Sequence, residues 1–278
     1  PSLVRPVDLP GALSLNSVVI NGSRVVGPII VAVLSQVGVT TAGFFFMNAA
    51  TYLFVIFALL RVNIPSFTPD TTQGWRRFTS GISLARQISG VSRLLLTLAS
   101  FSLFSLPYVG LFPAVAHVNF GIAEDGSTYK WLYATWGLGA ALGGLAIGTK
   151  FSHRDQRKLV QYGFVGFAAS MVLFALSRSA APAFIFGFIL GFAYFFTTTA
   201  MSIVVQSRLK PEVRGRVMSL WFMSFGGTVP LGNMLFGPVV DQYGARWLLL
   251  FGAAWALFLA WWCNVTALDA KRSFSVSE

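Results

Sequence analysis

Residues 182–205 read PAFIFGFILGFAYFFTTTAMSIVV, without a single charged side chain. A helix needs about 20 mostly apolar residues to cross roughly 30 Å of hydrocarbon, and this stretch is long enough. Gly187 and Gly191, four residues apart, allow a second helix to approach it closely. The stretch therefore predicts a membrane-spanning helix that packs against a neighbour.

The rest of the chain repeats this apolar pattern. Of its 278 residues, 55% are hydrophobic and only 10% are charged, whereas soluble domains carry about 25% charged residues. We therefore predict an all-α membrane protein with eight transmembrane helices. The stretches that meet the length criterion are residues 12–36, 42–61, 94–116, 129–149, 159–177, 182–205, 216–239 and 246–267.

The basic residues of the loops test this number of spans independently, because lysine and arginine gather on the cytoplasmic side of membrane proteins. With a cytoplasmic N-terminus, sixteen of the 20 lysines and arginines fall in inside loops. Only Lys130, Arg178 and Arg246 fall in outside loops, and Arg24 lies within the first span. The net charge of +11 thus belongs to one face of a membrane, and no nucleic-acid partner is expected.

The longest loop, residues 62–93, combines a basic character with helical periodicity. Its apolar residues recur at spacings of three and four beside arginines, which predicts a short amphipathic helix on the cytoplasmic membrane surface. A solvated basic linker is the alternative. The residues concerned are Trp75, Phe78, Ile82 and Ala85, with Arg76, Arg77 and Arg86.

Other function classes lack the residues that they need. Cys263 is the only cysteine, and His117 and His153 lie far apart in sequence, so we expect no metal and no cofactor. There is no phosphate-cradling loop for ATP, and no cluster of histidines or carboxylates near one membrane face. The sequence therefore does not indicate an enzyme.

An internal repeat relates the two ends of the chain. At an offset of 205 residues, the basic-proline pair Arg5-Pro6 matches Lys210-Pro211, and Gly22 and Gly27 match Gly227 and Gly232. The first two spans therefore resemble the last two, with four spans between them. Two six-helix halves related by a parallel repeat give this arrangement when the first four helices are absent.

Two segments make a family resemblance specific: NGSRVVGP at residues 21–28 and PEVRGRVMS at residues 211–219. With the repeat, they resemble the major facilitator superfamily, in particular the branch of the enterobactin exporter and macrolide efflux proteins. Gly27-Pro28 is similar to the antiporter motif of exporters, although Val31-Ala32 replaces its trailing Gly-Gly. The loop at residues 148–158 resembles the conserved cytoplasmic loop without its usual Asp-Arg pair.

This resemblance implies a twelve-helix carrier of which the chain forms helices five to twelve. Residues 1–61 would be the last two helices of the N-terminal bundle, residues 62–93 the central loop and residues 94–278 the six-helix C-terminal bundle. We expect a monomer in the bacterial inner membrane, with both termini of this chain cytoplasmic, that exports a small amphipathic molecule. A nutrient importer of the same fold and, more remotely, a non-transporting membrane protein are the alternatives.

Arg24 is the most unusual residue within a span, because a guanidinium near mid-membrane costs at least about 2.5–3.5 kcal/mol. Asn21 lies one turn before it on the same helix face. Both would face the bundle interior, where they would bind an anionic or carbonyl-bearing substrate or hold a gate. The alternative is a static hydrogen bond from Arg24 to helix-end carbonyls.

By analogy with the family, further site residues lie on the third, fourth and sixth spans. Tyr108, Trp136 and Tyr194 are predicted to bind substrate, although any one aromatic residue could instead face lipid. Protons are the candidate coupling ion, but every aspartate and glutamate lies in a loop or at a span end. The predicted gating or structural residues are Gly27, Pro28, Pro107, which would bend its span, Arg157 and Arg216.

Overall fold

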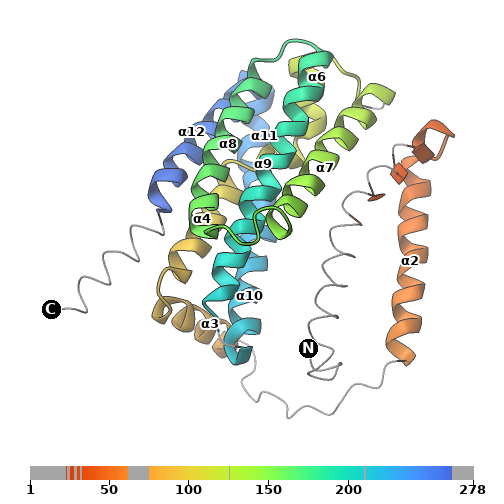
Figure 1. Ribbon diagram of the computed structural model, residues 1–278. Coiled ribbons are helices and arrows are strands. Elements are labelled where there is room, and N and C mark those ends of the chain that lie inside the picture. The colour runs from red at the N-terminus through yellow and green to blue at the C-terminus, as the bar shows by residue number, and fades with distance from the viewer. Residues whose placement is uncertain are drawn as a thin grey trace. The chain divides into compact units, whose positions relative to one another are not determined.

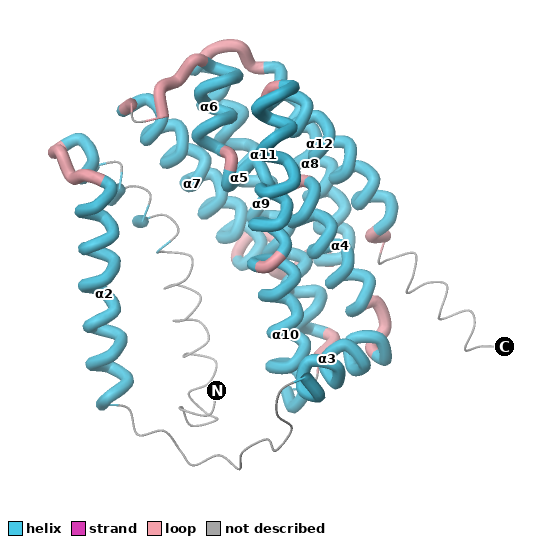
Figure 2. The backbone as a smooth tube through the Cα atoms, turned by 180° about the vertical axis from the view of Figure 1, so that it is seen from behind, coloured by secondary structure: helices cyan, strands magenta, loops and turns pink. Residues whose placement is uncertain are grey.

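The computed structural model describes residues 23, 26–27, 30–31, 33–61, 75–124, 126–209 and 211–264, with the backbone alone at 75–80 and 211–212. Every regular element in these ranges is a helix (Figures 1 and 2). The chain divides into two compact units, Pro1–Thr71 and Thr72–Glu278. The all-α prediction is therefore confirmed for the described residues.

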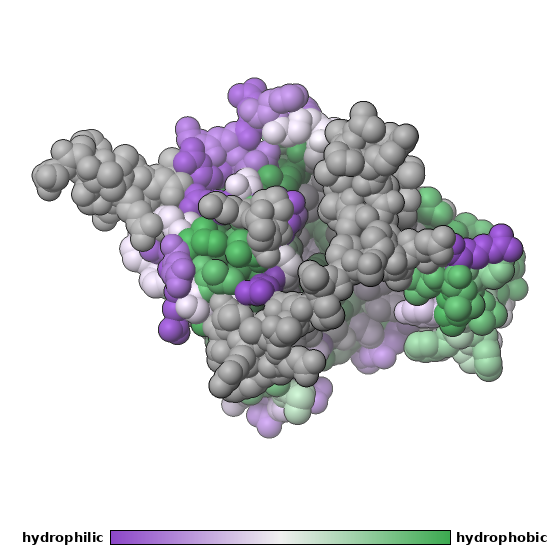
Figure 3. All heavy atoms as spheres, turned by 90° about the horizontal axis from the view of Figure 1, so that it is seen from below, coloured by the Kyte–Doolittle hydropathy of each residue, from purple (hydrophilic) through white to green (hydrophobic). Residues whose placement is uncertain are grey.

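The first unit contributes one well-described helix, α2 (Thr41–Arg61). A turn with Gly38 at φ 88° precedes it, and the Gly43 amide donates to the Thr40 hydroxyl in its first turn. Its apolar side chains are exposed on all sides, among them Phe46 and Phe54, and they form a green surface in Figure 3. Such a helix needs lipid or other helices around it.

The second unit is a bundle of ten helices within the described residues. Helix α9 packs against both α7 and α8, α12 packs against α8, and α4 packs against α10, α11 and α12. The bounds are α3 (Trp75–Gln87), α4 (Val91–Phe104), α5 (Pro107–Gly110), α6 (Phe112–Phe120), α7 (Ser127–Gly148), α8 (Gln156–Leu176), α9 (Ala180–Ser207), α10 (Pro211–Gly226), α11 (Thr228–Tyr243) and α12 (Ala245–Trp262).

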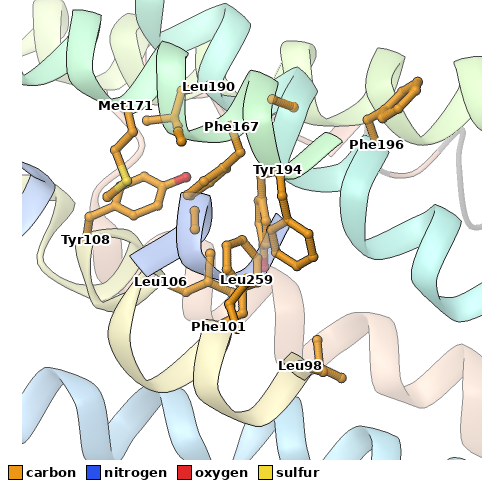
Figure 4. Packing of buried hydrophobic residues seen from close by; sticks show 14 of the residues in the cluster. Leu98, Phe101, Leu106, Tyr108, Phe167, Met171, Leu190, Tyr194, Phe196 and Leu259 are labelled. Carbon is orange, nitrogen blue, oxygen red and sulfur yellow. The ribbon is translucent and has the colours of Figure 1, made fainter. Parts of the chain in front are cut away.

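Aromatic rings fill the centre of this bundle (Figure 4). Phe101 of α4 meets Phe164 and Phe167 of α8 edge to face, with ring centroids 5.1 and 4.9 Å apart. All three side chains are fully buried. Such pairs contribute about 0.5–1.5 kcal/mol beyond their buried area, so this cluster fixes α4 against α8.

Four described helices are long and apolar enough to cross a membrane: α2, α8, α9 and α12. Two stretches predicted as single spans are interrupted. Residues 94–116 are divided among α4, α5 and α6, and residues 216–239 between α10 and α11. Pro107 lacks the N–H that would bond the Leu103 carbonyl, which explains the first interruption, and the second falls at Gly226 and Gly227.

The predicted helix in the 62–93 loop is present as α3. It is joined to α4 by a bend of 117°, with Gly90 at φ 75° in the corner. Ala85 is buried, and a Cβ on Gly81 would lie 3.3 Å from the Arg216 carbonyl oxygen of α10. One face of α3 therefore packs on the bundle, which the sequence did not predict.

The basic residues of the second unit are sorted between its two ends. Hydrogen bonds from Arg208 to the Ser89 carbonyl and from Gln161 to the Ala260 carbonyl bring one end of α4, α8, α9 and α12 together. The opposite end carries Lys130 in the first turn of α7, Arg178 in the loop between α8 and α9, and Arg246 in the first turn of α12. The residues at the first end are Arg86, Arg93, Lys150, Arg154, Arg157, Lys158, Arg208, Arg214 and Arg216.

Candidate functional site

Three predicted substrate-binding residues from three helices meet inside the second unit. Trp136 of α7 donates a hydrogen bond from Nε1 to the Tyr108 hydroxyl of α5, at 3.2 Å. The indole of Trp136 also stacks on Tyr194 of α9, with centroids 6.0 Å apart and planes 22° apart. Figure 4 shows Tyr108 and Tyr194 among the buried residues of this region.

Trp136 and Tyr194 are part of a longer row of stacked rings, which we call the aromatic ladder: Tyr129, Tyr133, Trp136, Tyr194 and Phe225. Successive centroids lie 6.3, 5.4, 6.0 and 6.4 Å apart, and successive planes differ by 27°, 28°, 22° and 13°. Offset stacking of this kind is favourable for aromatic side chains. The ladder thus links α7, α9 and α10.

Exposure changes along the ladder. Tyr133 is 38% exposed, whereas Trp136 and Tyr194 are 6% and 4% exposed. Tyr129 and Phe225 are half-buried. A small molecule can therefore reach the outer rings while the two central rings stay packed.

Glycines set the separation of α7 and α9, on which the stacking depends. A Cβ on Gly191 of α9 would overlap the Trp136 carbonyl oxygen, and one on Gly139 of α7 would overlap the Phe188 carbonyl oxygen. Gly143 meets the Phe192 carbonyl oxygen in the same way. The predicted close packing at Gly191 is thus present, and it places the α9 backbone against the backbone carbonyl of Trp136.

Tyr108 owes its position to the interrupted span. Helix α4 ends at Phe104, the Ser105 hydroxyl donates to the Gly252 carbonyl of α12 at 2.8 Å, and α5 begins at Pro107. Tyr108 is fully buried, with Phe112 and Phe167 beside its ring. In this conformation its hydroxyl orients Trp136, and direct contact with substrate remains a prediction.

Helix α11 packs directly on the same interruption. A Cβ on Gly232 would lie 2.8 Å from the Pro107 ring, and the Asn233 side chain lies against Gly110. The Asn233 Oδ1 atom is buried and has no hydrogen-bond partner among the described residues. The two interrupted helices therefore support each other next to Tyr108.

The structure describes contacts of two further predicted gating residues, Arg157 and Arg216. Arg157 Nε and Nη2 donate to Asp155 Oδ1 and Oδ2 at 2.9 and 3.0 Å, and the Arg157 amide donates to the same carboxylate at the N-cap of α8. These hydrogen bonds from Arg157 lower the pKa of Asp155. The Arg216 carbonyl accepts from the Ser219 hydroxyl at 2.7 Å and faces Gly81 of α3.

The remaining predicted residues belong to the first unit. Gly27 is helical, and a Cβ placed on it would meet no atom within 4 Å. Asn21, Arg24 and Pro28 lie outside the described residues. Within the described ranges, no group of three or more histidine, cysteine, aspartate or glutamate residues could hold a metal ion.

Sequence reasoning did not select Tyr129 or Phe225. Tyr129, Tyr133 and Trp136 are spaced by four and three residues, so they share one helix face, and this spacing could have indicated the outer half of the ladder. Phe225 gives no comparable signal, because it joins Tyr194 only through the packing of α10.

Comparison with known proteins matches residues 1–275 to the family described as transmembrane secretion effector. Two curated relatives are both named macrolide efflux protein A, one from Streptococcus pyogenes and one from its serotype M6 strain ATCC BAA-946 / MGAS10394. Each is 26% identical over 182 residues, covering 64% of this chain and 44% of the relative. The match thus spans less than half the length of either relative.

The family match covers nearly the whole chain and confirms the superfamily that the sequence motifs resembled. It also places the chain outside the enzymes, as predicted. The apolar helices and the sorted basic residues fit the same assignment. The chain belongs to the transmembrane secretion effector family of the major facilitator superfamily, and it is a multi-pass integral membrane protein.

Proposed function

We propose that this chain is part of a secondary active exporter that moves a small amphipathic molecule across the membrane by alternating access. Its eight spans would be helices five to twelve of a twelve-helix carrier, with α4–α6 and α10–α11 each counted as one interrupted span. The aromatic ladder, with Tyr108 behind Trp136, would be the part of the substrate site that the second unit supplies.

The assembly of the ladder from three helices is the observation on which this proposal mainly rests. Ligand sites in helical bundles are mostly apolar, with a few polar groups that fix orientation. Trp136 and Tyr194 provide apolar surface, and Tyr108, Tyr129 and Tyr133 bring hydroxyl groups to the same cluster. The direction of transport is supported by the relatives named as efflux proteins.

The basic end of the second unit would face the cytoplasm, since lysine and arginine are enriched there in membrane proteins. Trp247 and Trp261 of α12 are 65% and 74% exposed near the two ends of this helix, where interfacial tryptophans are common. Both termini of the chain would then be cytoplasmic. We place the protein in a bacterial inner membrane as a monomer.

Protons are the proposed coupling ion, although the second unit offers little for them to bind. Glu124 and Asp155 lie in loops and Asp241 lies in the last turn of α11. The titrating group of an antiporter would therefore lie among residues outside the described ranges, unless Asp241 or Glu212, in the first turn of α10, serves at a span end. Arg24 and Asn21, which lie outside the described residues, are proposed to bind the polar part of the substrate.

Flux measurements in both directions test this proposal. The transporter, expressed from its complete reading frame, should drive substrate into everted vesicles on addition of a proton gradient and show little uptake in right-side-out vesicles. Coupled uptake in right-side-out vesicles would instead establish an importer. Vesicles that move nothing in either direction, from a screen of amphipathic compounds, would contradict transport itself.

A further inference from the structure

We infer that the aromatic ladder selects substrates with a planar conjugated ring system and holds that ring by stacking. This rests on the proposed transport function and names the substrate class of the same site. The relevant observation is a row of five rings from three helices in which each ring lies within 28° of parallel to the next.

The ladder joins four near-parallel pairs into one row, and single near-parallel pairs, such as Phe112 and Phe174 at 29°, also occur beside it. Its successive planes are 13–28° apart, whereas Phe101 meets Phe164 and Phe167 at 86° and 75°. Edge-to-face contacts of that kind fill a core well but offer no common plane. Nearly parallel rings offer a flat ligand ring the same orientation at each step, and stacking of a flat ring is favourable for any π system.

The orientation of the central rings is fixed before a ligand arrives. The Trp136 indole is held by its hydrogen bond to Tyr108, and its backbone is held against Gly191. Tyr194 is further enclosed by Phe195, at 4.6 Å and 68°. A preorganised surface loses little conformational freedom on binding, which favours a rigid flat ligand over a flexible chain.

One carboxylate lies near the outer end of the ladder. Among the described residues, Glu124 lies near enough to Tyr129 to act on it electrostatically, at the outer end of α7. Stacking acts on the face of a flat ring whether or not the molecule carries a charge. The plane of the ring, rather than the charge on the molecule, should therefore decide what binds.

Three probes separate these features: ethidium, which is planar and cationic; lumichrome, which is planar and uncharged; and tetradecyltrimethylammonium, which is cationic without a ring. Binding to the purified transporter would be followed by tryptophan fluorescence and by calorimetry, and export would be followed in vesicles. Trp136→Phe identifies the part of the fluorescence quenching that comes from the ladder.

The decisive variant is Tyr133→Leu. Tyr133 stacks on Trp136, and at 38% exposure its ring can be reached by a ligand. We expect it to weaken ethidium and lumichrome about tenfold and to leave tetradecyltrimethylammonium within about twofold, since one stacked ring is lost. Tyr133→Phe keeps the ring and should recover planar-probe binding. Tyr162→Leu, on the exposed side of α8, is the matched control.

The outcomes distinguish this inference from the proposed function. Equal effects of Tyr133→Leu on all three probes, or no effect on any, would overturn the inference. Binding of ethidium without lumichrome would show that charge selects the ligand, which also overturns it. If only tetradecyltrimethylammonium is bound and exported, transport stands and the planar selectivity is wrong.

Discussion

Replacing Gly191 by alanine should displace the aromatic site without touching any of its rings. An ideal Cβ at this position lies 3.0 Å from the Trp136 carbonyl carbon and 3.1 Å from the Ala140 amide nitrogen, and it overlaps the Trp136 carbonyl oxygen. These are backbone atoms of α7, so no flexible side chain can move aside. Helices α7 and α9 must separate, on the order of 1 Å, to restore van der Waals contact.

The magnitude follows from two opposing effects. Overpacking a well-packed interface costs about 1–3 kcal/mol, and replacing glycine by alanine within a helix returns roughly 0.5–1 kcal/mol. A net loss of about 1–2 kcal/mol of folding free energy is therefore expected. If substrate binding loses a similar amount as Trp136 and Tyr194 move apart, the apparent KM rises about tenfold, since 1.4 kcal/mol corresponds to a factor of ten.

Two other glycines provide matched controls. A Cβ on Gly166 of α8 would meet nothing within 4 Å, and one on Gly187 of α9 would lie 3.3 Å from the Phe174 ring and would overlap no backbone atom. Export kinetics and the apparent melting temperature of the detergent-purified protein should change little in Gly166→Ala and moderately in Gly187→Ala. If Gly191→Ala behaves like Gly166→Ala in both assays, the glycine contact does not position the ladder.

Three further perturbations concern other parts of the chain. Asp155→Ala removes the N-cap of α8 and should destabilise the protein by about 1 kcal/mol. The pKa of Asp155 is lower in the folded protein than in the unfolded chain, so its contribution to folding stability is complete above the unfolded pKa and is lost only as the pH falls through the folded pKa. The difference in melting temperature between wild type and variant should therefore be the same at pH 6 and pH 8. Arg93→Ala removes the hydrogen bond from Nη2 to the Trp262 carbonyl and the cation–π contact at 4.4 Å, and a melting temperature equal to that of wild type would refute a structural role. Arg24→Ala should abolish export while the protein still reaches the membrane. Unchanged flux in vesicles would refute the proposed role of Arg24 in substrate binding.

The helical content and the sorting of charge could be predicted because both are local properties of the sequence. Residues 182–205 form the middle of α9, as their lack of charge predicts. The interruption of the third span could be predicted only in part. Pro107 indicated a bend, but the support from Gly232 and Asn233 of α11 depends on residues more than a hundred positions away.

The candidate site could be predicted only in part for the same reason. Tyr108, Trp136 and Tyr194 were selected by analogy with the family, and the structure brings them together. Their division of roles could not be predicted, because the burial of Tyr108 depends on Phe112 and Phe167 packing around it. Phe225 was missed since nothing in the sequence of α10 pairs it with Tyr194.

In the proposed topology, apolar helices cross a membrane and place the basic loops on its cytoplasmic side. Ser152 and Ser179 are exposed in the loops at the two ends of α8, and each can be replaced by cysteine in a Cys263→Ala background. A membrane-impermeant maleimide applied to intact cells should label Ser179→Cys and should label Ser152→Cys only after the membrane is opened. Labelling of both positions from the same side would contradict the account.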